Sequence, residues 1–208
     1  MATKPSRDTR QQILERAQNL FAQRGFYGTS IAAIVSELGI SKQALLHYFP
    51  TKEKLYGEVL ERISEGFATL ETHSVDDPAE QVKRYFAALC ERSMTKRGET
   101  MLLMRELMDN RRRAEHAGTW YLAGFLENLI AMVKAVPGWE KASPSQALSL
   151  AYAWLGAINY FALSGPTLNG IFGSETMHMT AQHYPLQLER IIEASLAAGP
   201  AASGQSTA

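Results

Sequence analysis

Polar side chains that can form hydrogen bonds crowd into one short stretch, residues 39–56, with the sequence GISKQALLHYFPTKEKLY. The stretch holds one histidine, two tyrosines and three lysines, while Leu45 and Phe49 form an apolar pattern beside them. Lysine and glutamine can form hydrogen bonds with guanine and adenine edges, and alanine can contact the methyl group of thymine. Lysine, histidine and tyrosine also suit phosphate oxygens. The chemistry that these residues favour is therefore the binding of a nucleic acid.

Two short helices must position these side chains. Thr29 or Ser30 can cap a helix that ends at Gly39, and Ser41 can begin a second, very short helix that Pro50 ends. Gly39 can take a positive φ in the tight turn between them, where another residue would be strained. Two short helices joined in this way are typical of a helix-turn-helix, whose second helix enters the major groove of DNA.

We expect the outward side chains of this helix pair to contact DNA. Lys42 and Gln43 lie at the start of the second helix, from which side chains reach base edges. The expected DNA-contacting residues are Thr29, Ser30, Ser41, Lys42, Gln43, Ala44, His47, Tyr48 and Lys52. The alternative is a solvated polar face on an ordinary helical hairpin.

The rest of the chain also has the apolar periodicity of helices. A first helix precedes the pair, from Asp8 or Thr9 to Gly25, and later helical stretches lie at about 79–95, 100–109, 113–135, 144–164 and 178–198. We therefore predict an all-α protein of about nine helices. It would have a three-helix DNA-binding domain at 1–50, a larger helical domain at 51–198 and a disordered tail at 199–208. Residues 51–72 would form the helix that connects the two domains.

The chain of 208 residues has no net charge, but its charges are unevenly distributed. Residues 1–60 hold eight Lys/Arg against five Asp/Glu (+3), and the remainder holds thirteen against sixteen (−3). This asymmetry lets the N-terminal end face an anion. The N-terminus lacks the apolar segment of a secretory signal, and no stretch approaches the roughly 20 uninterrupted apolar residues of a membrane span. We therefore expect a soluble, cytoplasmic protein with no membrane partner.

Few residues favour catalysis or metal binding. The lone Cys90 lies in an apolar run and is expected to be a buried core thiol. The histidines are scattered without a carboxylate or cysteine at ligand spacing, so we predict no metal site. The sequence has no G-x-S-x-G, P-loop or G-x-G-x-x-G motif, so we expect no catalytic residues and no cofactor. An all-helical enzyme without such motifs stays open as an alternative.

Residues 10–56 resemble the DNA-binding domain of the TetR family of transcriptional regulators. The resemblance rests on the lead-in YGTS at 27–30, the GIS turn, the HYF close of the recognition helix and the TKEKL opening of the next helix. These pieces match in order and spacing. The resemblance implies a homodimer that binds a two-fold operator in double-stranded DNA through the helix-turn-helix. It also implies an all-α effector-binding and dimerisation domain at 51–198. Many members have tyrosine where this chain has Leu46, a position that touches the DNA backbone in relatives.

The last two long helices suit dimerisation. The stretches at about 144–164 and 178–198 each carry a broad apolar side, and small residues would let helices approach closely. Two such helices from each subunit would make a four-helix interface. The alternative is that both helices are simply intramolecular core.

The middle of the chain is rich in methionine and aromatic residues, which usually indicate core. The resemblance instead implies an effector cavity among the middle helices, and such a lining would favour a largely apolar or aromatic small molecule. The expected ligand-binding residues are Met101, Met104, Arg105, Met108, Trp120, Tyr121, Phe125, Asn159 and Tyr160. The sequence therefore predicts a repressor that an effector releases from DNA. A constitutive repressor with no effector is the alternative.

Overall fold

The computed structural model describes residues 7–70, 75–109 and 123–201, and all regular structure in these ranges is helical. The helices are α1 (Arg7–Gly28), α2 (Ile31–Leu38), α3 (Lys42–Tyr48), α4 (Lys52–Ala68), α5 (Pro78–Thr95), α6 (Arg97–Asp109), α7 (Ala123–Lys134) and α8 (Pro144–Ala198). The predicted all-α class is confirmed, with eight helices in the described ranges where the sequence predicts about nine in all.

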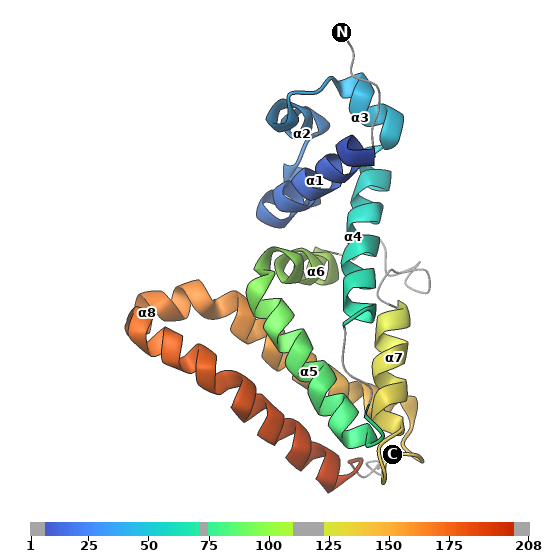
Figure 1. The fold of residues 1–208 in the computed structure, drawn as a ribbon, viewed down its shortest axis with the longest axis vertical. Coiled ribbons are helices and arrows are strands. Elements are labelled where there is room, and N and C mark those ends of the chain that lie inside the picture. The colour runs from blue at the N-terminus through green and yellow to red at the C-terminus, as the bar shows by residue number, and fades with distance from the viewer. Residues whose placement is uncertain (1–6, 71–74, 110–122, 202–208) are drawn as a thin grey trace, which may run out of the picture. The chain divides into compact units, whose positions relative to one another are not determined.

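The chain divides into two compact units (Figure 1). The N-terminal unit contains α1 to α4 together with α6, and the C-terminal unit contains α5, α7 and α8. The sequence-based boundary at residue 50 differs from this division, because α4 and α6 contact α1. Sequence distance therefore does not decide which helices support the helix-turn-helix.

Helix α1 is the base on which the other helices of the N-terminal unit pack. It contacts α2, α4 and α6. Its apolar residues recur at spacings of three and four, which places them on one face of the helix. All of them are buried, namely Ile13, Leu14, Ala17, Leu20 and Phe21. The apolar periodicity of α1 thus supplies a buried face in the helix that α2, α4 and α6 contact.

Serine caps begin both helices of the helix-turn-helix. The hydroxyl oxygen of Ser30 accepts a hydrogen bond from the Ala33 backbone N–H, and that of Ser41 accepts one from the Ala44 N–H, each at 3.1 Å. Such caps satisfy amide groups that have no partner inside the helix. Gly39 follows α2 with a φ of 65°, as the tight turn requires.

The backbone also breaks the helices of this region where the sequence predicts. Phe49 precedes Pro50 and takes an extended conformation (φ −133°, ψ 93°), so α3 stops before it. Regular helical conformation in the first helix is also interrupted at Gly25, as predicted. Gly25 takes a φ of 71°, a value that glycine adopts without strain, and a further helical turn follows the kink to Gly28.

The C-terminal unit is held together by contacts between residues that are far apart in sequence. The ring of Phe86 on α5 packs edge-on against Trp154 on α8, with centroids 4.9 Å apart. The buried indole N–H of Trp139 donates to the Leu196 carbonyl oxygen at 2.9 Å. These contacts fix α5 and the segment after α7 onto α8.

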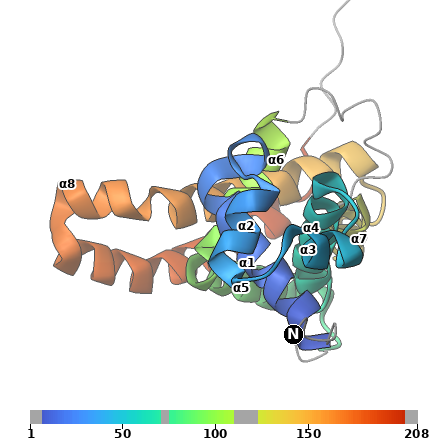
Figure 2. The ribbon, with the colours of Figure 1, turned by 90° about the horizontal axis from the view of Figure 1, so that it is seen from above.

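Helix α8 has 55 residues and covers both of the long C-terminal helices that the sequence predicts separately. The helix passes through Pro166 and kinks at Gly173, where φ is 81° and ψ is 164°. Figures 1 and 2 show the result: a first arm (144–172) and a second arm (174–198) that doubles back beside it. The Tyr184 ring stacks on Phe161 at 3.8 Å between centroids, and its hydroxyl donates to the Ala157 carbonyl at 2.6 Å.

Some of the predicted helix ends fall in or next to residues that the structure does not describe. Helix α4 ends at Ala68, before the predicted residue 72, and residues 71–74 lie outside the described part of the chain. The same holds for residues 110–122 at the start of the predicted helix 113–135, and for residues 202–208 of the tail.

Among the described helices, only α8 is long and apolar enough to cross a membrane by length and composition. One such helix is weak evidence, because a core or interface helix of a soluble protein passes the same test.

Candidate nucleic-acid interface

Helix α3 presents polar side chains on a buried apolar anchor. Leu45 and Phe49 have no exposed surface. The predicted DNA-contacting residues of this helix divide into an exposed group, Ser41, Lys42, Gln43 and His47, and a half-buried group, Ala44 and Tyr48. Because the anchor buries one side of the helix, which packs on α2, the other side is free to enter a groove of DNA.

The two capping serines also remain exposed. Each hydroxyl oxygen of Ser30 and Ser41 already accepts a backbone N–H, but a hydroxyl can still donate its own proton. A phosphate oxygen could therefore accept from either serine without loss of the cap. Their predicted DNA contacts are compatible with their structural role.

Thr29 has a different position from the one that the sequence suggests. Its side chain is 1% exposed, and its hydroxyl lies 2.9 Å from the Gly25 carbonyl oxygen and 3.1 Å from that of Leu20. The side chain is therefore not available to a phosphate. Thr29 instead ties the end of α1 to the start of α2, and we reassign it from contacting DNA to positioning the helix-turn-helix.

Lys52 is also engaged inside the protein. Its ammonium group donates to the carbonyl oxygens of Phe26 at 2.9 Å and Thr29 at 3.1 Å, and it lies 4.1 Å from the centroid of the Phe26 ring. An ammonium group has three donors, and two of them serve these carbonyls. Lys52 thus fixes the start of α4 to the end of α1, and a phosphate contact is at most a secondary role.

Ion pairs on the N-terminal unit join its helices. Arg10 pairs with Glu58 of α4, and Arg16 pairs with Glu37 of α2. Arg10 also lies 5.1 Å from the centroid of the Phe49 ring. These arginines contribute to the positive charge of the first sixty residues, yet their carboxylate partners neutralise them locally. On the exposed polar side of α3, Lys42 provides the lysine charge that could meet DNA.

The predicted ligand-binding residues fall in both units. Met101, Met104 and Arg105 are half-buried and Met108 is exposed on α6, which belongs to the N-terminal unit. The others that the structure describes belong to the C-terminal unit: Phe125 is buried, Asn159 is half-buried and Tyr160 is 77% exposed. Trp120 and Tyr121 lie outside the described residues. Neither unit by itself gathers the set around one cavity.

Arg105 has a structural neighbour that the sequence did not suggest. A methyl group added at Gly25 would lie 3.3 Å from its guanidinium Nη1, so the side chain lies against the kink in α1. Arg105 therefore contributes to the packing of α6 on α1, whatever further role it has.

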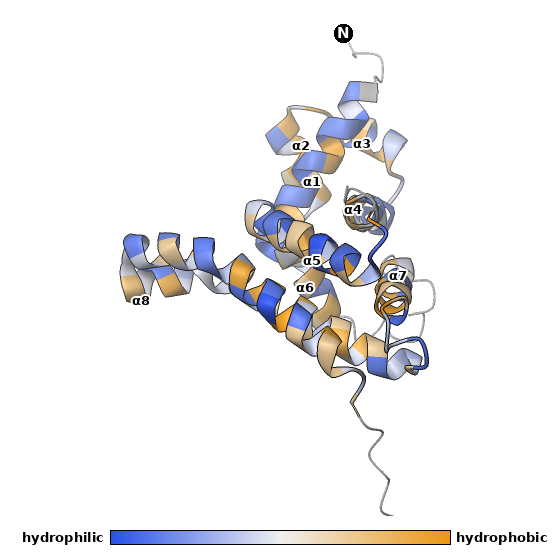
Figure 3. Ribbon diagram, turned by 60° about the horizontal axis from the view of Figure 1, so that its bottom comes forward, coloured by the Kyte–Doolittle hydropathy of each residue, from blue (hydrophilic) through white to orange (hydrophobic). Residues whose placement is uncertain are grey.

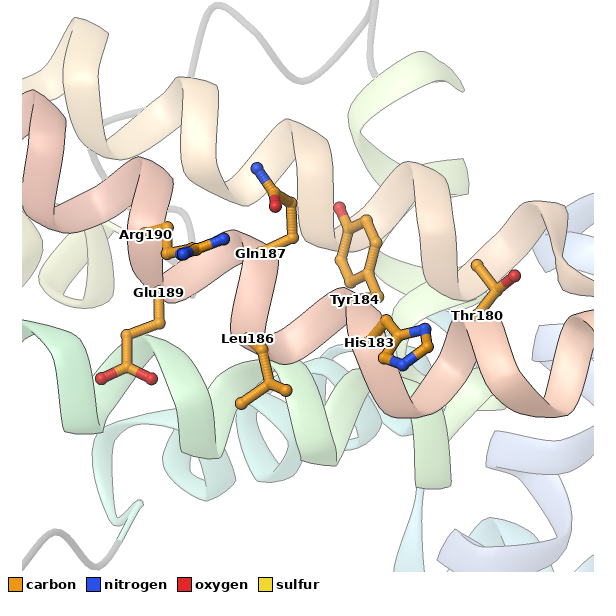
Figure 4. Close-up of a pocket in the computed structure, with 7 residues that line it drawn as sticks. All are labelled: Thr180, His183, Tyr184, Leu186, Gln187, Glu189 and Arg190. Carbon is orange, nitrogen blue, oxygen red and sulfur yellow. The ribbon is translucent and has the colours of Figure 1, made fainter.

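An open groove of roughly 710 Å³ follows the second arm of α8 (Figure 4). Its lining comes entirely from that arm and consists of Thr180, His183, Tyr184, Leu186, Gln187, Glu189 and Arg190. None of the predicted ligand-binding residues lies there. A groove along one arm has the form of a surface that a helix could cover rather than of an enclosed ligand site.

Trp154 is a candidate binding residue that sequence reasoning did not select. It is 2% exposed, and its indole Nε1 is buried with no hydrogen-bond partner among the described residues. A buried donor without a partner costs free energy, so such a group is a natural anchor for a bound acceptor. The sequence shows only an aromatic residue in an apolar helix, which is why its orientation could not be predicted.

Cys90 matches its expected role as a core thiol. It is free and buried, and burial raises the pKa of its thiol to about 11. The thiol therefore stays protonated at neutral pH and is a poor nucleophile. Among the described residues, no group of three or more His, Cys, Asp or Glu side chains could hold a metal ion.

The arrangement defines a class of protein: a helix-turn-helix with an exposed recognition helix, joined to a helical C-terminal unit. Comparison with known sequences agrees. Residues 13–59 match the family model described as bacterial regulatory proteins, tetR family. The HTH-type transcriptional regulator RutR of Escherichia coli K12 is 49% identical over 51 residues, which cover 24% of each chain. The match thus spans about a quarter of that relative. Residues 13–59 are therefore similar to the DNA-binding domain of TetR-family regulators.

Solved structures share the fold over nearly the whole chain. A TetR-like transcriptional regulator from Rhodococcus sp. RHA1 has a TM-score of 0.65 at 23% identity, over 93% of this chain and 99% of that one. A transcriptional regulator from Saccharomonospora viridis, solved in complex with choline, has a TM-score of 0.65 at 21% identity, over 90% of this chain and 97% of that one. At these identities the likeness concerns the fold alone.

Proposed function

We propose that this protein is a sequence-specific DNA-binding transcriptional regulator. It would act in the cytoplasm as a homodimer and be released from its operator by a small, largely apolar effector. The observation that carries the proposal is the exposed polar face of α3 above the buried Leu45 and Phe49. Folding of the N-terminal unit does not require these outward side chains, whereas reading of base edges does.

Selection of binding sites from random DNA tests the reading of sequence. The full-length protein should enrich a two-fold motif with half-sites roughly one helical turn apart. Gln43→Ala should relax the preference at one base pair of each half-site, by on the order of 1–3 kcal/mol. Gln11→Ala, at an exposed glutamine of α1, is the matched control and should leave the motif unchanged. If no sequence is enriched, or if Gln43→Ala gives the parental motif, the assignment of α3 is wrong.

The homodimer is supported by apolar side chains that α8 leaves exposed. Some residues of the predicted interface are buried within the chain, including Ala147, Ala151, Leu188 and Ile192. Other faces of the same arms still expose Tyr160 and Leu186, at 77% and 60%. Apolar positions continue along both arms in Figure 3. A second copy of α8 is the occupant that a two-fold operator requires.

We infer that the effector binds within the C-terminal unit and offers a hydrogen-bond acceptor to Trp154. Trp154 packs against Phe86, and Ile158, one helical turn further along α8, is also buried. These apolar side chains favour an apolar body for the effector. The unpartnered indole N–H favours one oxygen or nitrogen acceptor on it. The choline-bound relative supports the capacity of this fold to hold a small molecule.

A thermal-shift screen of small apolar acceptors tests the effector site, because a ligand that binds only the native state raises the melting temperature. A hit should also release operator DNA. Trp154→Phe should lower the affinity of the protein for that compound, since phenylalanine keeps an aromatic ring and lacks the N–H. Trp139→Phe is the control, because the Trp139 N–H already serves the Leu196 carbonyl. Equal weakening by both variants would remove Trp154 from the site.

A further inference from the structure

A buried carboxylate on α6 reaches across the N-terminal unit to α4. Glu106 is 5% exposed, and its Oε2 accepts a hydrogen bond from the Tyr56 hydroxyl at 2.8 Å. Tyr56 is itself 3% exposed. A carboxylate loses much of its hydration when it is buried, so it is stable there only with hydrogen-bond donors. The bond therefore fixes the position of α6 relative to α4.

Tyr56 continues this connection into the end of α1. Its ring packs edge-on against Phe21 and Phe26, with centroids 4.9 and 5.0 Å away. Lys52 lies one turn earlier on α4 and donates to the carbonyls of Phe26 and Thr29. Thr29 immediately precedes Ser30, the cap of α2. An unbroken series of contacts thus runs from α6 to the first residue of the helix-turn-helix.

Helix α6 lies against α1 over much of its length. Gln18 donates to the Glu99 carboxylate at 3.5 Å, and a methyl group at Gly98 would lie 3.7 Å from Ala22. Only Lys96 separates α6 from the end of α5, which belongs to the C-terminal unit. The contacts of Gln18 and Ala22 therefore hold the start of α6 against α1 within the N-terminal unit.

We propose that Tyr56 and Glu106 are positioning residues for DNA recognition. Their hydrogen bond holds α4, and through Phe26 and Lys52 the start of α2, in the orientation that sets the spacing of the two recognition helices. This role rests on the proposed function, since it concerns how a dimer meets two half-sites. It does not depend on which effector the protein binds.

The test measures half-site spacing with the full-length protein. Operators that the parent selects are varied by inserting or deleting one or two base pairs between the half-sites. Tyr56→Phe keeps the ring and removes the hydroxyl, and Glu106→Leu removes the acceptor. The preference is the ratio of the affinity for the parental spacing to the affinity for an altered spacing. Each variant should reduce this ratio by about fivefold, the size expected for the loss of one hydrogen bond. Glu106→Gln should keep the preference, because its amide oxygen can accept the same hydrogen bond.

Tyr85→Phe is the matched control. It removes the hydroxyl of a buried tyrosine in the C-terminal unit and should lower stability without changing the spacing profile. A variant that only reduces the folded fraction weakens all operators alike, so an unchanged profile for Tyr56→Phe would overturn the proposal. The same holds if Tyr85→Phe changes the profile equally.

Amide hydrogen exchange decides the same point without DNA. Tyr56→Phe should speed exchange of the amides at residues 29–35 several-fold relative to α5, whereas Tyr85→Phe should not. Unchanged exchange at residues 29–35 would contradict the coupling. A parent protein that selects no DNA sequence would contradict the proposed function instead, and the exchange result would still stand.

Discussion

The two units of this chain expose side chains of opposite chemistry. In the N-terminal unit, α3 exposes Lys42 and Gln43 above an apolar anchor with no exposed surface. In the C-terminal unit, α8 buries Trp154 and Ile158 but leaves Tyr160 and Phe172 at 77% and 60% exposure. The first surface suits a hydrated polyanion, and the second suits an apolar surface of another protein chain. The difference separates a polar surface on the N-terminal unit from an apolar surface on the C-terminal unit, and the predictions below test that division.

The largest effect is expected from removing the anchor beneath the polar face. Phe49→Ala should lower the free energy of unfolding by roughly 3–5 kcal/mol and abolish operator binding, because α3 loses its support. Phe86→Ala is the matched change in the C-terminal unit, since both rings have no exposed surface. It should destabilise comparably but leave detectable operator binding at a temperature where circular dichroism shows both variants folded. Equal binding by the two variants would contradict the division of roles.

A charge on the exposed face of α8 should separate the subunits. Leu186→Glu places a carboxylate on that face, so the variant should sediment as a monomer. Its operator affinity should fall on the order of 10²-fold or more, because each half-site then binds alone. Leu107→Glu changes an exposed leucine of α6 and is the control. If the Leu186→Glu variant still sediments as a dimer, the second copy does not cover this face.

Two lysines near the helix-turn-helix should respond differently to salt. Lys42→Ala should make the dependence of operator affinity on salt shallower by about one unit per subunit, because an exposed cation releases counterions from DNA. Lys52→Ala should leave that slope unchanged and lower the free energy of unfolding by about 1–2 kcal/mol, because its ammonium serves two carbonyls. Affinity at several salt concentrations and urea unfolding measure the two effects. A shallower slope for Lys52→Ala would restore it to the DNA interface.

The smallest effect concerns alkaline pH and the core of the C-terminal unit. Burial raises the pKa of the Cys90 thiol from 9.0 to about 11. The folded protein therefore retains this proton more strongly than the unfolded chain. The free energy of unfolding should fall as pH rises from 9 toward 11, by at most about 1.4 kcal/mol per pH unit. Urea unfolding of the parent and Cys90→Ala between pH 7 and 10 measures it. Parallel curves would show that another group is responsible.

The helix-turn-helix could be predicted closely because its signals are local. Ser30, Gly39, Ser41 and Pro50 each act on residues within four positions, so their types and spacing nearly determine α2 and α3. The roles of Thr29 and Lys52 could not be predicted in the same way. A polar side chain beside a turn can serve either a ligand or a neighbouring carbonyl, and only the folded backbone decides between them.

The C-terminal unit could be predicted as helical but not in its details. The gap between the two predicted helices, 144–164 and 178–198, contains the kink at Gly173. Which residue within that gap kinks depends on how the two arms pack, for example on the stacking of Tyr184 on Phe161. The pairing of Tyr56 with Glu106 joins residues 50 positions apart. No periodicity within one helix indicates such a contact, so the sequence could not predict it.

The exposed apolar arms of α8 have a consequence for gene dosage. If only a paired molecule can engage both half-sites, then at low abundance the amount of active regulator rises with the square of the number of chains in the cell. A modest change in expression would thus produce a disproportionate change in operator occupancy. Titration of a reporter against protein level would give a steeper response for the parent than for a covalently linked dimer.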